Sequence, residues 1–502
     1  MINTATEFIL EIVTAVCGFI LPRMILAHFG SAYNGITQSV SQFISCVALL
    51  KSGIGSVTRA ALYKPLAEHD SYTLSEITNA TSQYMQRIAL IFSGGILVFA
   101  AVYPFLTREY MSWLSTFLLV IILSIHTFAQ YFFGLTYQQV IQADQRNYFI
   151  SIVQIISVIA NTLIAAMLIN MDASIHIVKL GSALVFAIPP VIYMVYARKK
   201  YKIDKKVPPN KSLIAQRWDA FAHQIANFIN TNTDMILISM INGVLEVSVY
   251  SVYIMIVRHL RTAITAVMTG TQAAFGNMIA KKEYETLKNR FSQLELLMFF
   301  ISTIAFTTAW ILLIPFIRLY TKGITDVEYC RPVFALLICL ASYFSSAKLP
   351  YDLLVFANGS FKETKVGAFV EATLNILISV ILGHLIGMNG IIIGTVFSGL
   401  FRTMQYNIFV HKSIIADKKW FSIFKIFIYT YVCGTVCYFL SGLFLPEKMS
   451  GYGEWAIYAV AVFAVVVFVS VCALVAFFPK RCKLMLKDID KRFRLKKKGS
   501  AK

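Results

Sequence analysis

The chain alternates long apolar runs with short polar segments, and this pattern predicts membrane-spanning helices along most of its length. A helix needs about 20 predominantly apolar residues to cross the hydrocarbon core of a bilayer. We expect fourteen such spans, at 5–29, 36–60, 85–106, 113–136, 148–170, 175–197, 218–242, 247–279, 292–317, 331–356, 366–387, 390–411, 421–445 and 454–478. The predicted fold class is therefore an all-α integral membrane protein.

Composition and charge agree with this pattern. Of the 502 residues, 58% are hydrophobic and 14% are charged, whereas soluble proteins are roughly 45–50% apolar and about 25% charged. The net charge of +20 would suggest a nucleic-acid partner in a soluble protein. Here the Lys and Arg residues lie mostly between the apolar runs, so we expect membrane lipids and no nucleic acid as partners.

The basic segments also predict an orientation. Those richest in Lys and Arg are 198–217, 281–290, 411–419 and the tail from residue 480. If the helices alternate in direction, all four fall on one side of the membrane. Because loops rich in Lys and Arg stay in the cytoplasm, we expect both termini to be cytoplasmic.

An internal repeat divides the chain into two halves. RMIL at 23–26 matches DMIL at 234–237, and three further segments match in the same order, between 214 and 217 residues apart. The repeat predicts two parallel six-helix bundles around a central cavity, as in transporters built from repeats. The domains expected are 1–200, a basic linker at 201–217, 218–413, two additional helices in 414–479 and a basic tail at 480–502.

Three segments resemble a known family. They are LPRMILAHFGSAYNGI in the first span, SGIGSVTRAALYKPLAEHD after the second, and GMNGIIIGTVFSGL across the eleventh and twelfth. They resemble the polysaccharide flippases, the O-antigen or Wzx-type translocases of the MATE-like multidrug/oligosaccharidyl-lipid/polysaccharide exporter (MOP) superfamily. The arrangement of twelve plus two helices is similar to that family as well.

The resemblance implies a transporter rather than an enzyme. It would flip a polyprenyl-diphosphate-linked oligosaccharide, a precursor of O-antigen, capsule, exopolysaccharide or teichoic-type polymers, from the inner to the outer leaflet by alternating access. The expected location is a prokaryotic inner or plasma membrane. The expected partners are the lipid-linked substrate and other polysaccharide assembly proteins, and the expected state is a monomer.

Cations inside the spans are candidates for binding the diphosphate. A charge at the bilayer centre costs roughly 2.5–3.5 kcal/mol, so such residues usually face protein or a watery cavity. An anionic diphosphate needs cationic partners. The candidate cavity cations are Arg23, Lys51, Arg258, Arg261 and Lys348. The resemblance implies cavity-lining Arg and Lys in the first, second and eighth helices, which Arg23, Lys51 and Arg258 match.

Structural roles for these cations stay open. Arg258 and Arg261 are three residues apart and share a helix face. Lys348 and Asp352 are four apart and can neutralise each other. Lys179 and Arg402 are predicted to lie near helix ends, where a structural role is favoured.

Acidic and uncharged polar residues define a second group of candidates. His223, Asn227, Asn230 and Asp234 recur on one face of span seven, which lines the cavity or hydrogen-bonds to a neighbouring helix. Asp234, Glu371 and Asp352 are candidates for gating or for coupling to H⁺ or Na⁺, and the alternative is that they only balance nearby cations.

Apart from a coupling ion, we expect no cofactor. The eight cysteines lack metal-ligand spacing, so we expect no metal.

The first span carries a proline beside an arginine. Pro22 removes a backbone hydrogen bond and is the candidate hinge. Arg23 has Asp234 as its repeat partner, and we hypothesise that the two pair across the cavity. On an ideal helix Arg23 points about 160° away from the polar row Glu7, Glu11 and Thr14. Either the proline rotates Arg23, or the row faces something other than the cavity.

Two other classes remain as alternatives. One is a drug or cation exporter of the same superfamily, although cationic drugs would favour a negatively charged cavity. The other is a membrane polysaccharide polymerase or glycosyltransferase, which would normally place catalytic acids or bases in a sizeable outer loop. The longest predicted outer loop, 318–331, is small.

Overall fold

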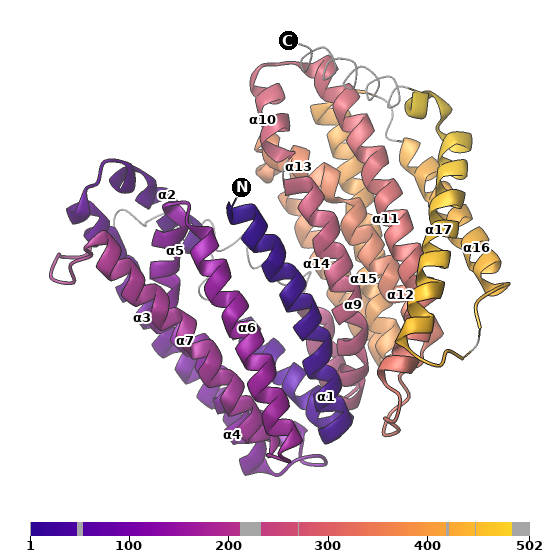
Figure 1. Cartoon of the computed structure of the whole chain (residues 1–502). Coiled ribbons are helices and arrows are strands. Elements are labelled where there is room, and N and C mark those ends of the chain that lie inside the picture. The colour runs from indigo at the N-terminus through magenta and orange to yellow at the C-terminus, as the bar shows by residue number, and fades with distance from the viewer. Residues whose placement is uncertain are drawn as a thin grey trace, which may run out of the picture. The chain divides into compact units, whose positions relative to one another are not determined.

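The computed structural model describes residues 2–47, 54–210, 232–269, 271–417, 421–446 and 448–483, and these ranges contain helices and connecting turns (Figure 1). They form two compact units. Unit 1 is Met1–Ser251 with Gly323–Val327, and unit 2 is Val252–Lys322 with Glu328–Lys502. The predicted domain boundaries stay predictions.

Unit 1 holds the helices of the N-terminal half. They are α1 (Ile2–Val47), α2 (Ile54–Ala67), α3 (Ser71–Val102), α4 (Trp113–Ala129), α5 (Leu135–Ala143), α6 (Asn147–Asn170) and α7 (Ile175–Tyr201). A 3-10 turn, η2 (Tyr103–Leu106), follows α3, and a π-helical turn, η3 (Gln130–Gly134), joins α4 to α5. The helix Asn232–Ile241 and the first turns of α9 (Val244–Thr269) complete the unit.

Unit 2 begins within α9 and holds the remaining helices. They are α10 (Gln272–Ala280), α11 (Tyr284–Tyr320), α12 (Pro332–Ala347), α13 (Leu349–Asn358), α14 (Phe361–Ile386), α15 (Met388–Phe409), α16 (Ser422–Gly442) and α17 (Tyr452–Phe477). A π-helical turn, η5 (Val410–Ile414), extends α15.

Ten helices in the described ranges are long and apolar enough to cross a membrane. The protein is therefore a multi-pass helical membrane protein, which confirms the predicted fold class, while the count of fourteen spans is not confirmed. One reason for the difference is α1, which contains the first predicted span and the beginning of the second. Its Gly30 has φ 84° and ψ 176°, a non-helical conformation that glycine adopts readily, so the chain turns there.

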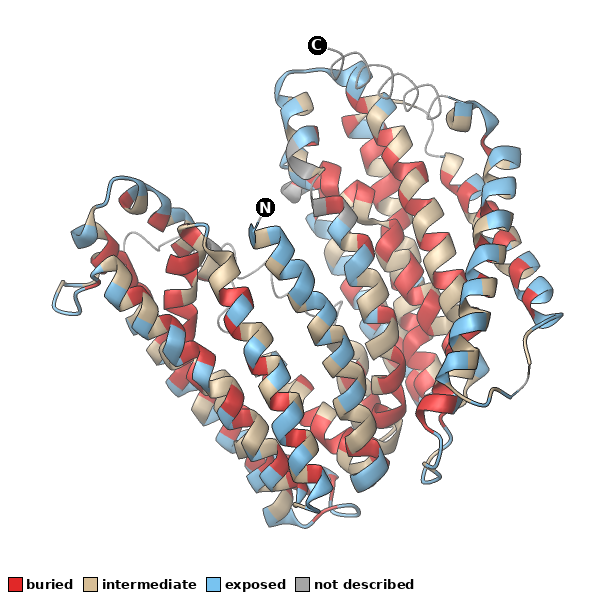
Figure 2. Cartoon of the chain, in the orientation of Figure 1, coloured by how far each residue is buried: buried red, intermediate tan, exposed pale blue. Residues whose placement is uncertain are grey.

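Figure 2 shows many exposed residues on α1, α6 and α17, and large apolar residues are among them. On α17, Ile457, Val460 and Phe468 are 70–72% exposed. Water would penalise such a surface, whereas hydrocarbon does not, and a helix satisfies its own backbone hydrogen bonds in lipid. The exposed apolar surface therefore agrees with helices that lie in a bilayer.

The helices recur with the spacing of the sequence repeat. α5 begins at Leu135 and α13 at Leu349, and α6 begins at Asn147 and α14 at Phe361. Each pair of starting points is 214 residues apart. The repeated sequence segments thus correspond to repeated helices.

Glycines allow α14 and α15 to pack closely. A Cβ atom at Gly390 would lie 2.0 Å from the Leu382 carbonyl oxygen, and one at Gly394 would lie 2.2 Å from Ser379 Oγ. Small residues four apart let two membrane helices approach in this way. The segment GMNGIIIG therefore builds a tight helical hairpin, and this hairpin positions the site described next.

Candidate functional site

Four charged side chains gather in unit 2 on neighbouring helices. Lys348 lies at the junction of α12 and α13, Asp352 on α13, Glu371 on α14 and Arg402 on α15. Lys348 Nζ donates to Glu371 Oε1 at 3.0 Å, and Arg402 Nε lies 3.3 Å from Glu371 Oε2. Asp352 interacts electrostatically with both cations. Two cations and two anions give a charge-balanced cluster.

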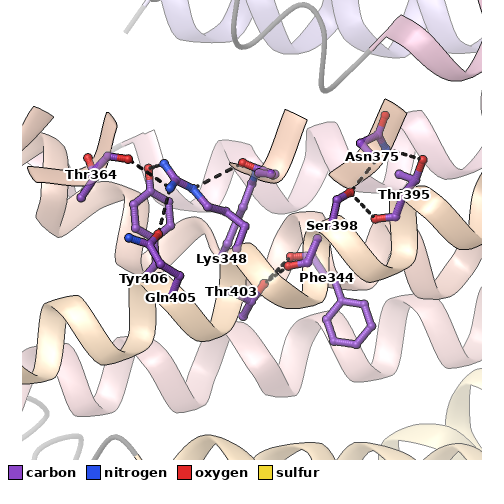
Figure 3. Close-up of polar contacts among 12 residues, drawn as sticks. Phe344, Lys348, Thr364, Asn375, Thr395, Ser398, Thr403, Gln405 and Tyr406 are labelled. Atoms are coloured by element: carbon purple, nitrogen blue, oxygen red, sulfur yellow. Dashed lines mark hydrogen bonds and ion pairs between the residues drawn. The ribbon is translucent and has the colours of Figure 1, made fainter. Parts of the chain in front are cut away.

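Arg402 is held by several further contacts, and their partners Thr364, Gln405 and Tyr406 are labelled in Figure 3. Its Nη1 donates to the Thr364 carbonyl at 3.2 Å and to Gln405 Oε1 at 2.8 Å, and its Nη2 donates to the Tyr406 hydroxyl at 2.7 Å. The guanidinium carbon lies 3.8 Å from the Tyr406 ring centroid. Gly367 leaves space for it, because a Cβ atom there would lie 2.4 Å from Nη1. Arg402 is only 4% exposed, so these contacts replace water as its solvent.

A row of uncharged polar groups continues along the same hairpin (Figure 3). Asn375 Nδ2 donates to Thr395 Oγ1 at 3.0 Å and to Ser398 Oγ at 3.3 Å. Thr403 Oγ1 donates to the Phe344 carbonyl at 3.3 Å. The row joins α14, α15 and α12 by hydrogen bonds next to the charged cluster.

The cluster unites three predicted site residues with one that the sequence analysis did not assign to the site. The structure brings Lys348, Asp352 and Glu371 together. The sequence offers Asp352 as the partner of Lys348, whereas the ion pair in the structure joins Lys348 to Glu371. Arg402, for which the sequence favours a structural role, is the fourth member of the cluster. One signal points to it: Glu371 precedes the turn at Gly387 by 16 residues and Arg402 follows it by 15, so an antiparallel hairpin places them opposite each other.

The predicted residues of the first span lie in unit 1. Arg23 is half-buried on α1, and Asp234 is half-buried on the helix Asn232–Ile241. The helix continues through Pro22, and the non-helical dihedral angles occur later, at Gly30. The hypothesised Arg23–Asp234 pairing and the hinge at Pro22 stay predictions.

The polar row of α1, formed by Glu7, Glu11 and Thr14, is exposed and lies beside other helices of unit 1. Asn147 Nδ2 donates to Glu7 Oε1 at 3.0 Å, next to the start of α6. Glu11 and Thr14 line a cavity of about 370 Å³ whose other walls come from α4 to α7. Whether the proline rotates Arg23 or this row faces something other than the central cavity stays a prediction.

The structure describes two of the remaining predicted site residues, Arg258 and Arg261. Arg258 is exposed on α9, and Arg261 is half-buried on the same helix. Both backbone carbonyls accept side-chain hydroxyls one turn later, from Thr262 at 3.1 Å and Thr265 at 2.9 Å. Lys51, His223, Asn227 and Asn230 lie outside the described residues.

A second charged network, around Glu295 on α11, was missed by the sequence analysis. The fully buried Glu295 accepts Arg481 Nη1 at 2.9 Å and the Tyr351 hydroxyl at 2.8 Å. His411 places Nε2 3.4 Å from Glu295 Oε1 and Nδ1 2.7 Å from Asp417 Oδ1. Glu295 falls within the predicted span 292–317, and an acid in an apolar span is the signal that indicates it.

Comparison with known proteins shows which fold these helices form. No family model and no curated protein sequence matches the chain. Among solved structures, the lipid II flippase MurJ in an inward closed conformation matches with a TM-score of 0.68 at 13% identity, over 95% of this chain and 98% of that chain.

Multidrug transporters share the fold too. An inward-facing multidrug resistance MATE family transporter of the MOP superfamily matches with a TM-score of 0.57 at 13% identity, over 80% of this chain and 95% of that chain. The eukaryotic MATE transporter AtDTX14 matches with a TM-score of 0.56 at 13% identity, over 83% and 96%. The chain therefore has the fold of MOP-superfamily transporters, and identities this low show the fold alone.

Proposed function

We propose that this protein is a flippase that moves a polyprenyl-diphosphate-linked oligosaccharide from the inner to the outer leaflet by alternating access. The observation that carries the proposal is the extent of the similarity to the lipid II flippase, which covers 95% of this chain with a TM-score of 0.68. The part of this chain outside the similarity is shorter than α16 and α17 together. The similarity therefore extends into α16 and α17, and this extent supports a lipid flippase.

The cations support an anionic substrate. Arg258 is exposed midway along α9, and an arginine in hydrocarbon would cost roughly 2.5–3.5 kcal/mol. We assign Arg258 to a watery cavity, with Arg261, Arg23 and Lys51 as the other diphosphate ligands. Lys348 has a smaller part in this proposal, because Glu371 already neutralises it at 3.0 Å.

The charged cluster of unit 2 supports a role in coupling. Protonation of Glu371 would remove one of two negative charges that balance Lys348 and Arg402, and the excess positive charge would then favour a rearranged hairpin. We propose Glu371, Asp352 and Asp234 as the residues through which H⁺ or Na⁺ drives transport. His223, Asn227 and Asn230 belong to the proposed polar face of the cavity.

The same proposal includes the location, orientation and partners of the protein. The protein would act as a monomer in a prokaryotic inner or plasma membrane, with both termini in the cytoplasm. Its partners would be the lipid-linked oligosaccharide, membrane lipids and other polysaccharide assembly proteins.

Reconstituted liposomes test the function. Purified protein should move a fluorescent polyprenyl-diphosphate sugar between leaflets faster than protein-free liposomes do, and equal rates would overturn the proposal. The double variant Arg23→Ala/Arg258→Ala should reduce transport at unchanged reconstitution, while Arg108→Ala, an exposed arginine in the turn after α3, should not. Full transport in the double variant would overturn the cavity assignment.

A drug or cation exporter is the second candidate, because MATE multidrug transporters share the fold with TM-scores of 0.56 and 0.57. Export of a cationic dye from the same liposomes, without movement of the sugar lipid, would favour it. A membrane glycosyltransferase or polymerase is the third class. It would instead be detected as lengthened or newly linked glycan in the same samples.

A further inference from the structure

A cavity of about 490 Å³ opens at the end of unit 2 where α11 begins and α17 ends, and Figure 1 shows these two helix ends on the same side of the unit. Its walls come from the first turns of α11, from η5 with the turn after it, and from the segment after α17. Among the described residues, the charged and titratable side chains that line it are Lys288, Arg290, His411, Asp417, Lys480 and Arg481. Four Lys and Arg thus face one acid.

Three basic segments of the sequence meet at this cavity. Lys288 and Arg290 come from 281–290, His411 and Asp417 from 411–419, and Lys480 and Arg481 from the start of the tail. Taken singly, each segment is an orientation signal for the neighbouring helices. Orienting the helices in the membrane does not require the three segments to line one cavity, so their convergence indicates a further role.

Ion pairs hold the walls of the cavity in place. Arg481 is paired with the buried Glu295 at 2.9 Å, and Asp417 accepts His411 at 2.7 Å and lies 4.0 Å from Lys288 Nζ. Both carboxylates are thus already neutralised within the wall. The lining thus holds more Lys and Arg side chains than acids, and one of these lysines, Lys480, is exposed.

We propose that this cavity binds the phosphate group of an anionic phospholipid in the leaflet at this end of the protein. Lys and Arg donate charge-assisted hydrogen bonds to phosphate oxygens. Basic groups just outside a membrane helix are attracted to anionic lipids. The cavity lies at the first turns of α11 and just after the end of α17. Both helices are long and apolar enough to span a membrane, so we infer that the cavity is near the lipid headgroups. The proposal does not depend on which substrate the protein transports.

Binding to detergent-solubilised full-length protein tests this site. The probe is short-chain phosphatidylglycerol, with short-chain phosphatidylcholine as the uncharged comparison and binding read from the shift in thermal unfolding. Phosphatidylglycerol should bind the wild type, and Lys288→Gln/Lys480→Gln should weaken binding about thirtyfold, which corresponds to roughly 1 kcal/mol for each cation.

A matched control distinguishes binding at this cavity from a general effect of the protein's positive charge. Lys64→Gln/Lys199→Gln removes the same charge from two exposed lysines of unit 1 and should leave the affinity unchanged. An equal loss in this control, or equal binding of phosphatidylcholine, would overturn the proposal. If the double variant does not unfold cooperatively, Lys480→Gln alone, at an exposed position, should still weaken binding several-fold.

Inorganic phosphate distinguishes the two sources of the group. Phosphate at the same concentration should give a much smaller shift, because the lipid is also held by its acyl chains. A shift as large as that with phosphatidylglycerol would assign the cavity to free phosphate and overturn the lipid proposal.

Discussion

Arg402 and Glu371 face each other across the hairpin of α14 and α15, with Arg402 Nε 3.3 Å from Glu371 Oε2. Both side chains are buried. A buried charge is tolerated only with a partner and further hydrogen bonds, and Lys348, Thr364 and Tyr406 provide these here. The pair therefore joins the two helices of the hairpin, and Lys348 links it to the junction of α12 and α13.

Removing one member of this pair should be costly. We expect Glu371→Ala to lower the free energy of unfolding by about 3–5 kcal/mol, because it leaves Arg402 buried without its counter-charge. Glu371→Ala/Arg402→Ala should recover part of the loss. Denaturant unfolding in detergent measures both. The control is Glu363→Ala, an exposed acid on the same helix, and an equal effect of Glu363→Ala and Glu371→Ala would contradict the prediction.

The space beside Arg402 should be sensitive to one added methyl group. Gly367→Ala would place Cβ 2.4 Å from Arg402 Nη1, and we expect it to destabilise unit 2 by about 1–3 kcal/mol through overpacking. Gly434→Ala is the matched control, since its Cβ would meet nothing closer than Thr307 Oγ1 at 4.0 Å. Thermal unfolding of the two variants should differ in direction, because alanine is otherwise the better residue in a helix.

Asp326 should stabilise the turn between the first two predicted spans. Its Oδ2 accepts the Ser31 backbone N–H and its Oδ1 accepts the Ser31 hydroxyl, both at 2.6 Å. Asp326→Ala leaves a helix N-terminus without this acceptor and should cost about 0.5–2 kcal/mol. Ser31→Ala keeps the backbone bond and should cost less. Unfolding temperatures of the two variants measure these costs. Glu109→Ala, at an exposed position, is the control and should leave the unfolding temperature unchanged.

Asp144 should make stability depend on pH. It accepts Arg146 Nε at 2.6 Å and the Tyr201 hydroxyl at 2.7 Å, and Lys200 Nζ lies 3.3 Å away. Burial raises the pKa of Asp144, but hydrogen bonds from Tyr201, Arg146 and Lys200 outweigh burial and hold the pKa below its ordinary value. A lowered pKa stabilises the fold above the unfolded-state value and loses that contribution as the pH falls through the folded-state value.

The variant Asp144→Asn reports this contribution. It should unfold at a lower temperature than the wild type above about pH 5, and the difference should shrink below about pH 4 as the wild-type carboxyl takes up its proton. Asp172→Asn changes a carboxyl that is 90% exposed and should show little difference at any pH. A difference for Asp144→Asn that persists unchanged into acid would contradict the assignment.

Arg258 should affect transport more than stability. Because its side chain is exposed, Arg258→Ala should leave the unfolding temperature nearly unchanged. It should slow flipping of the diphosphate lipid roughly tenfold or more, since hydrogen bonds to charged groups contribute about 1.5–3 kcal/mol. Arg258→Lys should retain part of the rate. Lys365→Ala, an exposed cation on α14, should behave as the wild type in the same liposome assay.

The hairpin segment GMNGIIIG shows how far sequence reasoning extends. Its glycines and apolar residues predict two helices and a turn, and the structure confirms both helices. The depth at which they cross depends on Gly394 meeting Ser379, a contact between residues in different helices. Periodicity within one helix contains no record of that contact, so the sequence favours a structural role for Arg402 without identifying Glu371 as its partner.

By itself, the sequence determined that this is a multi-pass helical membrane protein with a repeat, because a bilayer forces apolar runs into helices that satisfy their own backbone. Only the tertiary structure decided the partners of the charged residues. It paired Lys348 with Glu371, joined Glu295 to Arg481, and turned Glu7 toward α6. The physical reason is that an ion pair acts over a few ångströms, and only the packing of helices determines which side chains come that close.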